Sequence, residues 1–315
     1  MLLLIAQAVP APAPAGKPAE PAPFVLGVLR RDGLVTPFAA FDGKRWETPW
    51  PGDLRDVKLP NSLDAVPGRW WGKAGAPAEM SVWADGSQRG TVRLERPTAL
   101  RVMCDSRLAL TSTYRSKEPA PLPMVQPYPK DGLAISGTQP IEAIEIVPRT
   151  APEWSSMAMK LIELADRTET SAISSLPDWK HPFARRERQK TPVEIEMLYR
   201  APMDAAGWMV YYVEAIKRYP PGPEDDGCGL VTSVKGWITS GPDFKSEDSI
   251  SARITYCDRK DVTFMLPLGL ITTRGKTYWI YQVSGYGREV YVVTRPTPKS
   301  IEPQAHYDAG ICGQP

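Results

Sequence analysis

Histidine, the commonest catalytic base and metal ligand, is almost missing from this chain of 315 residues. Only His181 and His306 occur, so histidine-based triads and multi-histidine metal sites have almost no raw material. The sequence also has no P-loop, no G-x-G-x-x-G motif and no G-x-S-x-G elbow. These absences argue against metal-dependent, histidine-based and nucleotide-dependent catalysis, and we expect no cofactor and no metal site.

The chain also lacks a surplus of either charge. Lys and Arg total 38 against 36 for Asp and Glu, a net charge of +2. Nucleic-acid-binding proteins normally carry a clear positive excess, so we expect no nucleic-acid partner. No apolar run reaches the roughly 18 to 20 residues that a membrane-spanning helix needs, so we expect no membrane span.

Cysteine is scarce but even in number. The four residues are Cys104, Cys228, Cys257 and Cys312, and no C-x-x-C pair suggests zinc or redox chemistry. This usage predicts two disulfides, with four buried thiols of a cytosolic protein as the alternative. A hairpin near residues 241–244 would bring Cys228 opposite Cys257, but the alternation of apolar residues places them on opposite faces unless a bulge intervenes. All three connectivities therefore stay open.

Residues 1–23 have the pattern of an export signal. The apolar segment Leu2–Ala6 precedes a small-x-small pattern at Ala6–Ala8, although no basic residue comes before Lys17. Residues 9–23 then alternate Pro and Ala, which favours an extended, disordered spacer. Together with the cysteines, this segment predicts an exported protein, periplasmic or extracellular.

The rest of the chain is dominated by alternating apolar and polar residues punctuated by turn signals. The segment 24–41, with Asp32-Gly33 at its middle, predicts a hairpin that opens an N-terminal β region over residues 24–150. A capping box at Thr150–Glu153 and a helical apolar stripe predict a helix over about 152–170, followed by a solvated connector to residue 192. Residues 193–315 predict about seven antiparallel strands. The expected fold is therefore mainly β, with antiparallel meander or sandwich-like sheets bridged by one helix.

Aromatic residues are the one class that stands out for function, with 10 Trp and 12 Tyr. Because strands alternate, Trp279 and Tyr281 share one face of a predicted strand, and this face needs either cover or a ligand. Trp and Tyr combine flat apolar rings with a polar edge, which suits sugar and peptide ligands. The predicted ligand-binding residues are Trp70, Trp71, Trp279, Tyr281, Tyr286 and Tyr291.

These observations predict a non-catalytic envelope or extracellular module that binds a polysaccharide or a protein partner. One alternative is a hydrolase that uses carboxylates, with Glu214 paired with Asp225 or Asp226, because such pairs carry no local signature. The other alternative is a purely structural or assembly protein, which buried aromatic faces would favour.

Overall fold

A computed structural model describes residues 21–55, 57–122, 125–176, 178–222, 227–242, 245–260 and 262–312. The protein is mainly β, with 50% strand and 13% helix, and its sheets are antiparallel. The predicted fold class is therefore confirmed. Most of the predicted signal segment, residues 1–20, lies outside the described residues.

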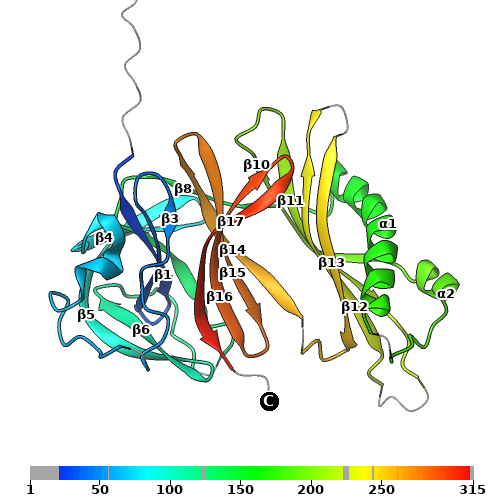
Figure 1. Cartoon of the computed structure of the whole chain (residues 1–315), viewed down its shortest axis with the longest axis horizontal. Coiled ribbons are helices and arrows are strands. Elements are labelled where there is room, and N and C mark those ends of the chain that lie inside the picture. Colours follow the sequence, from blue (N-terminus) through cyan, green and yellow to red (C-terminus); the bar gives the residue numbers. More distant parts are fainter. Residues whose placement is uncertain are drawn as a thin grey trace, which may run out of the picture.

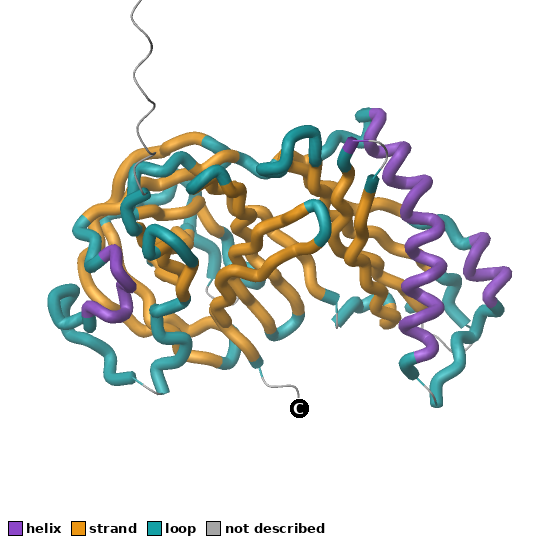
Figure 2. The backbone as a smooth tube through the Cα atoms, turned by 45° about the horizontal axis from the view of Figure 1, so that its top comes forward, coloured by secondary structure: helices purple, strands orange, loops and turns teal. Residues whose placement is uncertain are grey.

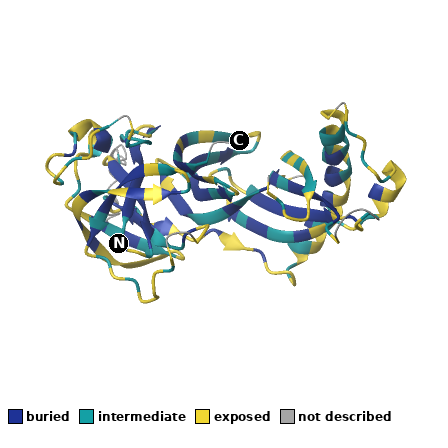
Figure 3. Ribbon diagram, turned by 90° about the horizontal axis from the view of Figure 1, so that it is seen from below, coloured by how far each residue is buried: buried dark blue, intermediate teal, exposed yellow. Residues whose placement is uncertain are grey.

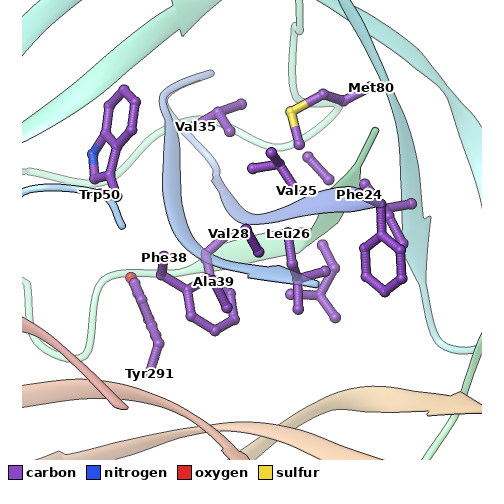
Figure 4. Close-up of a cluster of buried hydrophobic side chains, with 14 of the residues drawn as sticks. Phe24, Val25, Leu26, Val28, Val35, Phe38, Ala39, Trp50, Met80 and Tyr291 are labelled. Carbon is purple, nitrogen blue, oxygen red and sulfur yellow. The ribbon is translucent and has the colours of Figure 1, made fainter. Parts of the chain in front are cut away.

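The N-terminal strands close into a barrel. Its sheet has the order β1-β7-β4-β5-β6-β2-β3, and an added pairing between β1 and β2 completes the ring. Buried aromatic and aliphatic side chains fill the interior (Figure 4). The strands are β1 (Phe24–Arg30), β2 (Val35–Phe41), β3 (Trp46–Glu47), β4 (Glu79–Ala84), β5 (Ser87–Val102), β6 (Asp105–Ser112) and β7 (Lys130–Ile135).

The C-terminal strands form two sheets rather than one meander of about seven strands. We call them the central sheet, ordered β17-β16-β15-β14-β8, and the outer sheet, ordered β13-β12-β11-β10-β9. The central sheet comprises β8 (Ile141–Glu142), β14 (Thr263–Thr273), β15 (Lys276–Gly285), β16 (Arg288–Thr297) and β17 (Ser300–Ile311). The outer sheet comprises β9 (Glu145–Ile146), β10 (Glu194–Pro202), β11 (Met209–Arg218), β12 (Leu230–Ser240) and β13 (Ser246–Tyr256).

The molecule is built in four layers (Figures 1 and 2). One face of the central sheet packs on the barrel, and its other face packs on the outer sheet. Helix α1 (Pro152–Ser174) covers the remaining face of the outer sheet. This packing buries most strand residues, whereas the loops and α2 (Arg185–Lys190) are mostly exposed (Figure 3).

The helix region differs from its prediction in two details. Ala151, not Thr150, is the N-cap residue, so no side chain caps the helix, and Glu153 instead bonds Arg200 with a 2.5 Å separation between oxygen and nitrogen. The predicted capping box at Thr150–Glu153 was therefore wrong: α1 begins one residue later than the box requires, and its N-cap has no capping side chain. The connector is also not wholly solvated, because it forms α2 and buries Arg188.

The four cysteines form two disulfides, as predicted. Cys104 at the β5–β6 turn bonds Cys312 beyond β17, and Cys228 bonds Cys257. The alternation argument against the second pair fails because the ladder ends at the pair Leu230 and Tyr256. Both cysteines lie beyond that pair, where strand alternation no longer fixes side-chain direction. Two disulfides indicate an oxidising environment.

Candidate functional site

The longest irregular segment of the barrel, residues 48–78, joins β3 to β4. Ordered segments of this length without strands are uncommon in compact proteins and are often functional. Four buried side chains anchor the segment in the barrel core: Trp50, Val66, Trp70 and Trp71. The Trp50 indole donates a hydrogen bond of 3.0 Å to the Leu108 carbonyl, and Figure 4 shows it at the edge of the core cluster. We call this segment the tryptophan loop.

Local hydrogen bonds give the tryptophan loop its shape. The backbone N–H of Val66 donates to the Leu63 carbonyl at 3.0 Å, and that of Trp70 donates to the Pro67 carbonyl at 2.9 Å. The chain then forms a short 3-10 helix over Gly68–Ala74. This helix places the consecutive residues Trp70 and Trp71 beside Trp50. The centre of the Trp50 ring lies 4.9 Å from that of Trp71 and 6.0 Å from that of Trp70.

A cavity of about 510 Å³ lies within this loop. Its apolar lining consists of Val57, Leu59, Pro60, Ala65, Pro67 and Trp70. Leu59 is exposed, whereas only 7% of the Trp70 surface remains accessible. We call the nearly buried Trp70 the floor of the cavity, and its aliphatic and proline side chains the walls. A concave site with apolar walls and a few polar groups is the usual form of a binding pocket.

The polar part of this lining is cationic. Lys58, Asn61 and Arg69 complete the lining, and no Asp or Glu is found among the described lining residues. Neither Lys58 nor Arg69 forms an ion pair with a described residue, although the loop's other cations do: Arg55 pairs with Asp53 and Lys73 pairs with Asp42. Hydrogen bonds from Arg55 lower the pKa of Asp53, so that carboxylate is already engaged. The cavity thus offers two positive charges that no described carboxylate pairs with.

The second predicted aromatic cluster is covered by the protein itself. Trp279 and Tyr281 on β15 face the outer sheet, where the Trp237 ring lies 5.0 Å and 5.7 Å from theirs. Tyr291 faces the barrel, with its ring 5.3 Å from that of Phe38 (Figure 4). Packing rather than a ligand satisfies both faces. Of the six predicted residues, Trp70 lines the cavity, Tyr286 stands alone in a turn with 80% exposure, and the other four are buried away from it.

Glu214, the carboxylate of the hydrolase alternative, is buried between the outer and central sheets with 5% exposure. It accepts a hydrogen bond of 2.6 Å from the backbone N–H of Met265. Burial raises the pKa of Glu214 to about 7, against the lowering effect of that bond and of Lys235. Its proposed partners Asp225 and Asp226 lie outside the described residues. Glu214 lines none of the described cavities, so its geometry supports a packing role.

Over the described part of the chain, no group of three or more His, Cys, Asp or Glu residues is arranged to hold a metal ion. Within the same residues, no helix has the length and apolarity needed to cross a membrane.

The sequence did not single out Lys58, Leu59, Asn61 or Arg69. The available signal was indirect: residues 48–78 fit neither strand nor helix periodicity, yet contain tryptophans that need burial. Comparison of the chain with protein-family models, with curated proteins and with solved structures gives no match.

Proposed function

We propose that this is an exported, non-catalytic module that binds a protein partner by receiving a short peptide segment in the tryptophan-loop cavity. The observation that carries the proposal is the cavity itself, which joins an aromatic floor to aliphatic walls on an anchored loop. Apolar walls beside Arg are typical of the places where proteins bury a partner's anchoring side chain. Rigid anchoring also reduces the entropy lost on binding. Export is supported by the two disulfides.

A peptide fits this lining better than a sugar does. Sugar sites use an open aromatic face together with many hydrogen-bonding groups for the hydroxyls. Here the Trp70 ring is almost covered, and Asn61 supplies the one uncharged polar side chain of the described lining. Leu59, Pro60 and Pro67 instead offer aliphatic contact of the kind that a peptide side chain fills. Binding of a carbohydrate remains an alternative that the following test can detect.

The test is a selection from a random peptide display library, run in parallel with a glycan array on the full, disulfide-bonded chain. Ala65 is exposed and lines the cavity, so Ala65→Trp fills the cavity without disturbing the core. The matched control is Ala206→Trp, at an exposed alanine in the β10–β11 turn. We expect the wild type and the control to enrich a common set of peptides, and Ala65→Trp to lose them.

Each other result counts against the proposal. Glycan binding without peptide enrichment would support the carbohydrate alternative. Enrichment of the same peptides by Ala65→Trp would place the binding surface elsewhere. Absence of both kinds of binding in the wild type would favour the structural or assembly protein.

A further inference from the structure

We infer that the segment received by the tryptophan-loop cavity is acidic, with Asp or Glu side chains next to an apolar residue. This inference rests on the proposed function and names the chemical class of the peptide. It depends on a feature that binding in general does not require, namely the two cations Lys58 and Arg69.

The cations of the tryptophan loop differ in whether they have carboxylate partners among the described residues. The loop contains four cations, of which Arg55 and Lys73 have carboxylate partners within the protein. Lys58 and Arg69 have none among the described residues, and both line the cavity. Unpaired like charges at one site repel each other, and an incoming carboxylate relieves that repulsion. Among the described residues, the loop thus leaves Lys58 and Arg69 without a carboxylate partner at the cavity.

The position of the two cations also matters. Lys58 and Arg69 line the same cavity as the apolar wall residues and the floor residue Trp70. Each charge therefore adjoins an apolar contact surface, so a ligand that satisfies both needs a carboxylate close to a hydrophobic side chain. Arg can hold a carboxylate through two parallel hydrogen bonds, which adds geometric selectivity to the attraction.

The apolar lining separates an acidic peptide from other anions. A free phosphate or sulfate would use Lys58 and Arg69 but would leave the walls formed by Val57, Leu59 and Pro60 in contact with water. A peptide with an acidic and an apolar residue uses both parts of the lining. We assign the acid to an Asp or Glu side chain, and amidating the peptide's C-terminus tests whether the terminal carboxylate binds instead.

The test is a charge reversal read out by the same display library. The double variant Lys58→Glu with Arg69→Glu should enrich peptides rich in Lys and Arg, whereas the wild type should enrich peptides rich in Asp and Glu. The matched control reverses one exposed lysine and one exposed arginine far from the loop in sequence, Lys276→Glu with Arg186→Glu. This control should select the same acidic peptides as the wild type.

A selected acidic peptide then provides a quantitative measurement. We expect its dissociation constant to rise about tenfold or more in the cavity double variant, and to rise in the wild type as salt increases. Replacing its Asp and Glu by Asn and Gln should weaken binding to a similar extent. Amidating the C-terminus should have this effect only if the terminal carboxylate is the acid that binds.

The outcomes separate this inference from the proposed function. If the wild type enriched peptides that Ala65→Trp does not bind but that have no excess of Asp or Glu, this result would overturn the inference of an acidic peptide and leave the proposed function standing. Selection of the same acidic peptides by the charge-reversed cavity variant would also overturn the acidic class. If the wild type enriched no peptide that Ala65→Trp fails to enrich, the proposed function itself would be overturned.

Discussion

At the scale of single residues, a buried glutamate among the described residues at each interface between layers pairs with a hydrogen-bond donor or an ammonium group of the adjoining layer. Glu169 of α1 accepts from Lys217, Tyr219 and Thr232 of the outer sheet at 2.6 to 2.7 Å. Glu214 of the outer sheet accepts from Met265 of the central sheet. Glu289 of the central sheet lies 2.9 Å from the Lys130 ammonium of the barrel. Breaking such a contact leaves a desolvated group unpaired, so these glutamates penalise misaligned layers.

Glu214 gives a pH dependence with a definite sign. Its pKa is about 7 in the folded protein and near the ordinary 4.5 in the unfolded chain. Between these values the folded state holds a proton that the unfolded state has released, so the free energy of unfolding falls as pH rises. The full effect is about 3 kcal/mol. It is present below pH 4.5 and is lost as pH rises to about 7.

Glu214→Gln tests this expectation because a glutamine oxygen can still accept from Met265 but does not titrate. Chemical denaturation of both proteins at pH 5 and pH 8 should show a fall in wild-type stability that exceeds that of the variant by about 2 to 3 kcal/mol. Groups such as His181 titrate in both proteins and cancel in the difference. Equal pH dependence of the two proteins would show that Glu214 is ionised throughout.

The candidate site could be predicted only in part at this scale. Trp70 was identifiable because a tryptophan in a Pro- and Gly-rich stretch needs either burial or a ligand. Lys58 and Arg69 were not, because the sequence does not show which cations find partners inside the fold. Strand alternation correctly placed Trp279 and Tyr281 on one face. It could not show that Trp237 of the outer sheet covers that face.

At the scale of elements, periodic patterns predicted the opening hairpin, most of the C-terminal strands and α1, but not β17 (Ser300–Ile311), and failed where packing between elements decides. The stripe in residues 152–170 appears as the buried positions Met157, Leu161, Leu164 and Ala165 of α1. The division of the C-terminal strands into two sheets was not predictable, because the same alternation serves a strand in either sheet. The break occurs between the end of β13 at Tyr256 and the start of β14 at Thr263, where no sequence signal differs from that of an ordinary turn.

Two neighbouring residues of α1 test which face stabilises the helix. Leu161 is fully buried against the outer sheet, whereas Ile162 is 59% exposed. Leu161→Ala should lower the free energy of unfolding by about 2 to 5 kcal/mol through lost burial and a residual cavity. Ile162→Ala should change it by less than about 0.5 kcal/mol. Denaturant unfolding of both variants measures these changes. Similar losses of unfolding free energy in the two variants would mean that α1 is rotated relative to this packing.

At the scale of the whole molecule, one disulfide joins layers and the other acts within a layer. Cys104–Cys312 ties the barrel to the end of the central sheet across 208 residues of sequence. It is reinforced by Asp105, which accepts a 2.9 Å hydrogen bond from the backbone N–H of Ile311. Cys228–Cys257 closes 29 residues at the end of the outer sheet. The first bond therefore restricts the unfolded chain more than the second does, although the effect grows only with the logarithm of loop length.

This difference predicts the order in which disulfide loss affects stability. Loop closure stabilises by about 5 kcal/mol for the long loop and about 4 kcal/mol for the short loop. Cys104→Ser with Cys312→Ser should therefore lower the thermal unfolding midpoint more than Cys228→Ser with Cys257→Ser does. The wild type should show no reactive thiol in denaturant and four after reduction. Free thiols in the unreduced chain would contradict an oxidising environment, and a reversed order of midpoints would show that Cys228–Cys257 supports more of the fold than its own sheet.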